Sequence, residues 1–203
     1  MSNEIFTHKF FGLLEAEARR HINPDGSEGA IVAVTARIAE GLTLSSALIE
    51  IGPYAYIGSG AYIGPRAKIG GAAYIGPRAY IGTEANIGPG ANIRRGAYIG
   101  PGANICLNAN IGRGANIGPG ANIEKGDWFM SIGPIGSEGR HTTIVHKCGV
   151  GLRFWTGCFQ DKTGAEFRAA IAETHGDNQH AKAYLWMLDA VERHPEVLKR
   201  EAG

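Results

Sequence analysis

The chain has little of several features that would narrow its function. Its three cysteines, Cys106, Cys148 and Cys158, are widely spaced and form no CxxC pair, which argues against a disulfide framework and predicts reduced thiols. No stretch is long and apolar enough to cross a bilayer. The N-terminus lacks the basic start and apolar core of a secretory signal. We therefore expect a cytoplasmic protein with no membrane partner.

Acidic residues and histidines are scarce where the chain is most regular. Residues 51–123 contain six basic residues and one acidic residue, a net charge of +5, whereas residues 1–50 and 124–203 carry −3 and −1. No histidine lies between residues 22 and 140. A basic segment between acidic ends favours a small anionic ligand, while no feature points directly to a nucleic-acid polymer. The commonest general base is absent from this segment.

A six-residue repeat with the consensus I-G-x-x-A-x is the most abundant pattern and runs through twelve successive units from Ile51 to Asn122. Such a short fixed period is typical of solenoids. In Ala-x-Ile, strand alternation sends Ala and Ile to one side and x to the other. Glycine and proline between these strands supply a tight turn, with the last corner position suited to a positive φ. Each unit therefore predicts one short strand and one corner, with Ile and Ala inside.

This repeat resembles the hexapeptide-repeat, left-handed β-helix family, which is best known from trimeric acyltransferases. The resemblance implies a mainly β fold, a left-handed parallel β-helix in which three units form one coil of eighteen residues. Twelve units then give about four regular coils. It also implies a homotrimer. The same architecture occurs in proteins without enzymatic activity, so the fold alone does not assign a reaction.

Three regions follow from this interpretation: an N-terminal cap (1–46), the β-helix (47–126) and a C-terminal α+β module (127–203). A solenoid end exposes unpaired strand edges and needs a cap. Residues 4–21 predict an amphipathic helix because Phe6, Phe10, Leu13 and Leu14 fall on one helical face. Residues 30–38 predict a strand leading into the first coil.

The C-terminal module is predicted as β-β-β-α-α. Strands are expected over 127–136, 140–147 and 150–158, followed by a helix that Thr163 and Glu166 open as a capping box, and by a second helix ending near Arg193. The module resembles a cap of uncharacterised bacterial and bacteriophage proteins. The matching segments are GPIGSEGR (133–140), TGCF (156–159), EF (166–167) and THGDNQH (174–180).

Winding at eighteen residues per coil would gather distant basic residues on one corner: Arg78, Arg94, Arg95 and Arg113. Tyr80 and Tyr98 follow on the adjoining face. Guanidinium groups bind phosphate and aromatic rings stack on bases, so this set predicts a nucleotide-like ligand. Two alternatives remain open. The tyrosines are also typical of a subunit interface, and the arginines could pair with acidic groups of a neighbouring subunit. A ligand held between subunits would combine these interpretations.

The C-terminal module offers further candidate ligand contacts. Ser137 and Arg140 lie in a glycine-rich turn suited to an anion. His175, Asn178 and His180 cluster at a helix start, where helix capping and loop packing is the alternative, and we expect no metal site.

Our favoured interpretation is a non-catalytic, trimeric binding protein for a small nucleotide-like anion, without a cofactor. The resemblance of the C-terminal module adds the hypothesis of a phage-type protein that sequesters a signalling nucleotide. The alternative is an acyl-CoA-dependent O- or N-acyltransferase that uses coenzyme A. The family resemblance implies a histidine base for that reaction, and only His141 or His146 could be delivered from the C-terminal module. A second alternative is a structural oligomer that binds nothing small.

Overall fold

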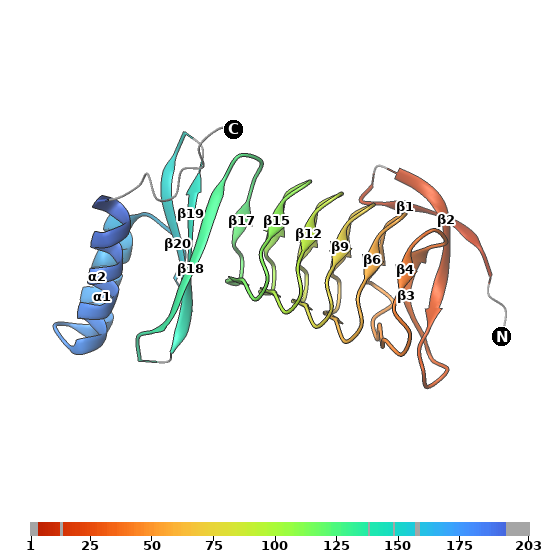
Figure 1. Ribbon diagram of the computed structural model, residues 1–203, viewed down its shortest axis with the longest axis horizontal. Helices are drawn as coiled ribbons and strands as arrows, with labels where there is room; N and C mark the ends of the chain where they lie inside the picture. The colour runs from red at the N-terminus through yellow and green to blue at the C-terminus, as the bar shows by residue number, and fades with distance from the viewer. Residues whose placement is uncertain (1–3, 13, 138, 148, 157–158, 194–203) are drawn as a thin grey trace. The chain divides into compact units, whose positions relative to one another are not determined.

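The computed structural model describes residues 4–12, 14–137, 139–147, 149–156 and 159–193 (Figure 1). The chain divides into two compact units, Met1–Ile117 and Gly118–Gly203, and each is described here by itself. No described helix has the length and apolarity that a membrane span requires.

The first unit is a parallel β-solenoid of about five turns, whose strands follow one another in regular rows (Figure 1). Each repeat contributes a two-residue strand. Tyr80 pairs with Tyr62 on one side and with Tyr98 on the other, which confirms the predicted eighteen-residue coil. The left-handed winding that the resemblance implies stays a prediction. The repeat strands of this unit are β5 (Glu50–Ile51), β6 (Tyr56–Ile57), β7 (Tyr62–Ile63), β8 (Lys68–Ile69), β9 (Tyr74–Ile75), β10 (Tyr80–Ile81), β11 (Asn86–Ile87), β12 (Asn92–Ile93), β13 (Tyr98–Ile99), β14 (Asn104–Ile105), β15 (Asn110–Ile111) and β16 (Asn116–Ile117).

The strands form three sheets, one for each side of the coil. The repeat strands are preceded in the chain by β1 (Phe6–Phe10), β2 (Leu14–Ile22), β3 (Glu28–Ala33) and β4 (Arg37–Ile38). The sheet orders within this unit are β16-β13-β10-β7, β15-β12-β9-β6-β4 and β1-β2-β3-β5-β8-β11-β14. The interior is filled as predicted, because the repeat isoleucines and most repeat alanines are buried. Glycine follows most of the repeat isoleucines, and this preference has a steric cause. A Cβ on Gly82 would lie 2.4 Å from the backbone nitrogen of Pro101 in the next coil. The last corner position has a positive φ, as at Gly60.

The predicted helix over residues 4–21 is wrong, because these residues form a hairpin of β1 (Phe6–Phe10) and β2 (Leu14–Ile22). Phe6, His8 and Phe10 are more buried than the residues between them, which is the two-residue period of a strand. Phe6 and Phe10 are four residues apart, and this spacing places two side chains on the same face of a strand and also on the same face of a helix. Strand pairing decides the outcome, because β2 pairs with β3 (Glu28–Ala33), which in turn pairs with β5. The hairpin thus extends one solenoid sheet and covers its edge.

The strand predicted over 30–38 is divided in two. β3 ends at Ala33, and β4 (Arg37–Ile38) begins a different sheet by pairing with β6. A corner at 34–36 separates them. These strands add an irregular first coil, which accounts for a solenoid longer than the four regular coils expected from the repeats.

The second unit contains β17 (Asn122–Ile123) and an antiparallel sheet with the order β18-β19-β20-β21. β18 (Trp128–Ile135), β19 (Arg140–Lys147) and β20 (Gly151–Thr156) confirm the three predicted strands, and β21 (Phe159–Lys162) is an additional one. Two helices follow, α1 (Gly164–His175) and α2 (Gln179–Arg193), as predicted. They lie along the sheet (Figure 1). Their packing buries a core that includes Ile144, Phe154, Phe167, Tyr184 and Leu188.

Candidate functional site

The four predicted arginines lie along one edge of the solenoid. We call this the arginine edge and define it by the stacked corners 58–60, 76–78, 94–96 and 112–114. Backbone hydrogen bonds join neighbouring corners. The Arg78 N–H donates to the Ser59 carbonyl at 3.0 Å, and the Gly114 N–H donates to the Arg95 carbonyl at 3.1 Å. The structure therefore brings together residues up to 35 positions apart, Arg78 to Arg113, on three successive coils.

All four arginines are exposed, and among the described residues none of them forms an ion pair. The other two basic side chains of residues 51–123 differ. Arg66 lies 2.9 Å from Glu84 on another edge, and Lys68 lies 3.3 Å from Glu50 on a sheet face. The unpaired positive charge of the repeat segment is thus concentrated on the arginine edge. Such an array attracts anions and supplies the planar donors that phosphate oxygens accept.

Arg94 occupies a corner position where the preceding coils of this edge have Gly58 and Gly76. A Cβ on Gly76 would lie 2.6 Å from the backbone nitrogen of Arg95 in the next coil. The backbone hydrogen bond between neighbouring coils is longer at Arg94. The Arg94 N–H donates to the Ile111 carbonyl at 3.0 Å, whereas the Gly76 N–H donates to the Ile93 carbonyl at 2.7 Å. The fold itself does not require an arginine at this tight position.

Two ladders of stacked tyrosines flank the arginine edge. Tyr62, Tyr80 and Tyr98 stack with ring centroids 4.7 and 4.8 Å apart, and Tyr56 stacks on Tyr74 at 5.1 Å. Both faces of the Tyr80 ring are therefore covered by its neighbours. A base cannot stack on Tyr80, which offers only its ring edge and hydroxyl. Burial and the neighbouring Tyr62 and Tyr98 raise the pKa of Tyr80, so its hydroxyl remains a neutral donor.

Among the C-terminal candidates, His175 contacts Tyr184 on α2. Gly136, in the turn that precedes β19, packs so closely that a Cβ there would lie 2.1 Å from the Tyr184 hydroxyl. His175 stacks on the Tyr184 ring at 5.8 Å, and the His175 and His180 rings are 6.0 Å apart. Ser137 is exposed in the same turn. The side chain of Arg140 and residue 138 lie outside the described part of the structure.

Asn178 has a structural role at this cluster. Its side-chain oxygen accepts hydrogen bonds from the backbone N–H groups of His180 and Ala181 at 2.9 and 3.0 Å. Asn178 therefore caps the start of α2, which is the alternative to a ligand contact that the sequence left open. The described residues contain no group of three or more histidine, cysteine or acidic side chains that could hold a metal ion.

The two candidate general bases lie on opposite faces of β19, because five positions separate them and successive strand residues alternate. The Nδ1 atom of His141 lies 3.4 Å from the Ser131 hydroxyl, whereas His146 is opposite Trp128 on β18. The two histidines therefore cannot serve one reaction centre together. Cys148 and Cys158 lie outside the described residues, and the Cys106 thiol donates to the Leu107 carbonyl at 3.5 Å.

Sequence reasoning missed an apolar groove of about 290 Å³ in the first unit. The hairpin contributes Phe10, Phe11 and Leu14, and a second solenoid edge contributes residues that include Pro53, Tyr54 and Pro89. The groove was missed because residues 4–21 were predicted as a helix and not as the hairpin that lines it. The available signal was the run of apolar residues at one corner, since Pro53, Ala72 and Pro89 recur there at intervals of about eighteen residues.

Comparisons with known proteins agree with the repeat architecture. Residues 60–95 match the family described as bacterial transferase hexapeptide (six repeats). No curated protein matches the chain.

Two solved structures are similar to this chain. One is a mutant of perosamine N-acetyltransferase from Caulobacter crescentus in complex with CoA and GDP-perosamine, with 22% identity over 50% of this chain and 49% of that chain and a TM-score of 0.32. The chain thus spans about half the length of that protein. The other is a hexapeptide transferase family protein from Anaplasma phagocytophilum, with 15% identity over 81% of this chain and 93% of that chain and a TM-score of 0.36.

Proposed function

We propose that the arginine edge binds a phosphate-bearing ligand of nucleotide type. The observation that carries this proposal is the placement of Arg78, Arg94, Arg95 and Arg113 on one edge, exposed and without ion-pair partners among the described residues. Guanidinium groups form charge-assisted, often bidentate hydrogen bonds with phosphate. A bound anion also relieves the repulsion between arginines on adjacent coils.

Coenzyme A is the favoured member of this class. The matched family is one of transferases, and the matched segment contains Arg78, Arg94 and Arg95. The phosphates of coenzyme A suit the guanidinium donors. Because the Tyr80 ring is covered on both faces, its hydroxyl can contact the ligand but its face cannot hold the adenine.

Isothermal titration calorimetry with coenzyme A tests this proposal. We expect the triple variant Arg94→Gln, Arg95→Gln, Arg113→Gln to bind at least about 100-fold more weakly than the wild type, since each hydrogen bond to a charged group contributes about 1.5–3 kcal/mol. Arg66→Gln is the matched control, because it removes one positive charge from a different edge. Equal losses in both variants, or no binding by the wild type, would overturn the proposal.

Acyl transfer from an acyl-CoA is a second candidate function, favoured by the match to a transferase family. In such a reaction His141 or His146 would accept the proton of an acceptor hydroxyl or amine as that acceptor attacks the thioester carbonyl, and the thiol would leave. Release of thiol from acetyl-CoA in the presence of candidate acceptors measures turnover. His141→Gln and His146→Gln serve as controls for each other, because the two side chains lie on opposite faces of one strand.

Tight binding without turnover would instead support the sequestration of a nucleotide by a non-catalytic protein. Failure to bind any nucleotide or coenzyme A would leave the structural oligomer. We also propose a homotrimer, in keeping with the family resemblance. The outer tyrosines support an interface, since Tyr62 is 48% exposed and Tyr74 is 41% exposed. Light scattering coupled to size-exclusion chromatography measures the mass of the assembly.

A further inference from the structure

The arginine edge distributes its charge along the solenoid axis. Arg78 lies on one coil, Arg94 and Arg95 on the next, and Arg113 on the third. Neighbouring parallel strands lie about 4.8 Å apart, so the outer two coils are roughly 10 Å apart. The stacked rings of Tyr62, Tyr80 and Tyr98 repeat at the same interval, 4.7 and 4.8 Å.

The Arg78 side chain also contacts the coil that precedes its own. Its Cγ atom lies 3.6 Å from the position that a Cβ would take on Gly60, in the preceding coil. The first part of the Arg78 side chain therefore lies against the corner 58–60 of the preceding coil. Convergence of the guanidinium groups on one point would be unfavourable, because it would bring like charges together.

One phosphate group cannot contact all of these arginines. Charge-assisted hydrogen bonds from guanidinium to phosphate are about 2.7–2.9 Å long, so a single phosphate bridges at most two adjacent coils. A chain of linked phosphates along the axis would reach further, and each phosphate would contact the arginines of its own coil. The hydroxyls of Tyr80 and Tyr98 add one donor beside each of the two coils that carry Arg78 and Arg94–Arg95, and Asn116 takes the same place beside Arg113.

We infer that the arginine edge selects ligands by the length of their phosphate chain. It binds diphosphates and longer polyphosphates, laid along the solenoid axis, more tightly than monophosphates. This inference rests on the proposed function, because it names the ligand class of the same site. Arg95, on the middle coil, contacts monophosphates and longer ligands alike. A monophosphate can bridge Arg95 to only one of Arg78 and Arg113 at a time, so it can use either one, whereas ligands with more than one phosphate contact both outer coils together.

Calorimetry with orthophosphate, pyrophosphate and tripolyphosphate at constant ionic strength tests the inference. We expect the affinity of the wild type to rise about tenfold or more with each added phosphate. Arg78→Gln and Arg113→Gln should each weaken tripolyphosphate about tenfold and change orthophosphate less than about twofold. Arg95→Gln should weaken all three ligands. Arg66→Gln, on another edge, should change none of them.

The outcomes separate this inference from the proposed function. Equal affinity for the three phosphates, together with binding of coenzyme A, would overturn the inference and leave the function intact. Loss of tripolyphosphate binding in Arg66→Gln equal to that in Arg78→Gln would also overturn it, because general charge attraction would then explain the trend. No binding of any phosphate or of coenzyme A by the wild type would overturn both.

Discussion

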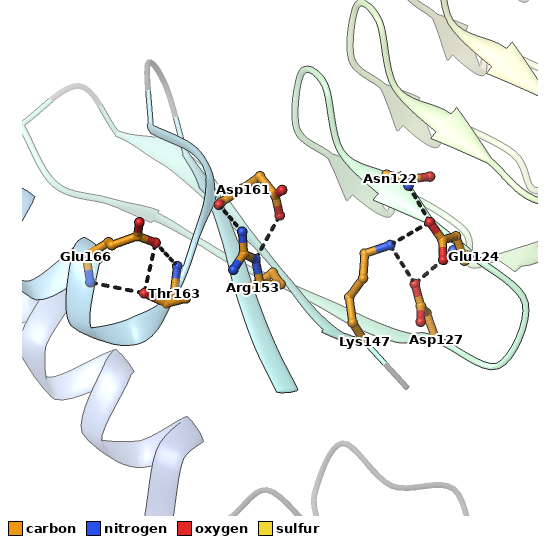
Figure 2. Close-up of polar contacts among 8 residues, drawn as sticks. All are labelled: Asn122, Glu124, Asp127, Lys147, Arg153, Asp161, Thr163 and Glu166. Atoms are coloured by element: carbon orange, nitrogen blue, oxygen red, sulfur yellow. Dashed lines mark hydrogen bonds and ion pairs between the residues drawn. The ribbon is translucent and has the colours of Figure 1, made fainter. Parts of the chain in front are cut away.

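The two units of the protein place their basic side chains in different surroundings. In the second unit most described basic side chains have carboxylate partners, as Figure 2 shows for Lys147 with Glu124 and Asp127 and for Arg153 with Asp161. Arg168 also pairs with Asp189 and with Glu192. On the arginine edge of the first unit, four arginines have no such partner among the described residues.

This difference separates charges that serve folding from charges that do not. The solenoid obtains its stability from buried isoleucine and alanine and from backbone hydrogen bonds between coils, none of which needs an arginine at the corner. The C-terminal sheet instead uses Lys147 to join the end of β19 to the segment before β18. Substitutions in the two units should therefore have opposite consequences for stability and for ligand binding.

The largest effect on stability is expected for Asp127→Asn. The Asp127 side chain is only 2% exposed, lies 3.2 Å from the Lys147 amine and accepts the Glu124 N–H at 2.9 Å. The variant leaves Lys147, which is 13% exposed, without its buried counter-charge. Breaking such a pair costs about 3 kcal/mol of unfolding free energy, which denaturant titration measures.

Glu124→Gln is the control for this prediction. The Glu124 side chain is 60% exposed and lies at the same 3.2 Å distance from the Lys147 amine. Because water screens an exposed pair, the loss should stay below about 1 kcal/mol. Equal losses in the two variants would show that burial does not distinguish these carboxylates.

A smaller loss is expected for Thr163→Ala at the start of α1. Figure 2 shows the capping box, in which the Thr163 hydroxyl accepts the Glu166 N–H and the Glu166 carboxylate accepts the Thr163 N–H at 2.8 Å. Loss of such a cap costs about 1 kcal/mol, measured by thermal or denaturant unfolding. Thr174→Ala, at an exposed position of the same helix, should cost less than that. The reverse order would contradict the capping role.

Local signals made much of this architecture predictable. The repeat specifies its own corners and core, because a glycine that would meet the next coil and an isoleucine that fills the interior recur in every coil with few exceptions. The start of α1 followed from Thr163 and Glu166 in the same way. The position of the four arginines on one edge required only the coil length, which the repeat supplied.

The parts that sequence reasoning missed depend on contacts distant in the chain. Residues 4–21 form strands because β3 offers an edge to pair with, and that edge is invisible in the local pattern of Phe6 and Phe10. β21 is short and contains the polar run Gln160–Lys162. The accessibility of the Tyr80 ring to a stacked base could not be judged from the sequence for a similar reason. Strand alternation placed the tyrosines in a ladder, but ring stacking then covered both faces of Tyr80.

The same capping box predicts a modest dependence of stability on pH. Hydrogen bonds from the Thr163 backbone and then from its hydroxyl lower the pKa of Glu166. Because the folded-state pKa is the lower one, the stabilisation is complete above the unfolded-state pKa and is lost as the pH falls through the folded-state pKa. The stability difference between wild type and Glu166→Gln should therefore shrink below about pH 4. A constant difference from pH 7 to pH 3 would contradict the assignment, and Glu173→Gln, at an exposed position of the same helix, serves as the control.

The smallest effect on stability, and the clearest separation of the two units, is expected for the double variant Arg95→Gln, Arg113→Gln. Removing exposed, unpaired charges on adjacent coils should leave the unfolding free energy unchanged within about 0.5 kcal/mol or raise it slightly, because like charges repel. Any gain should disappear at high salt, where exposed charges are screened. Arg66→Gln should instead lower stability slightly, since it breaks the exposed pair with Glu84. A loss above about 1 kcal/mol in the double variant would show that the arginine edge stabilises the fold. Its charge would then no longer be evidence for a ligand, whereas unchanged stability with loss of coenzyme A binding would assign these arginines to binding alone.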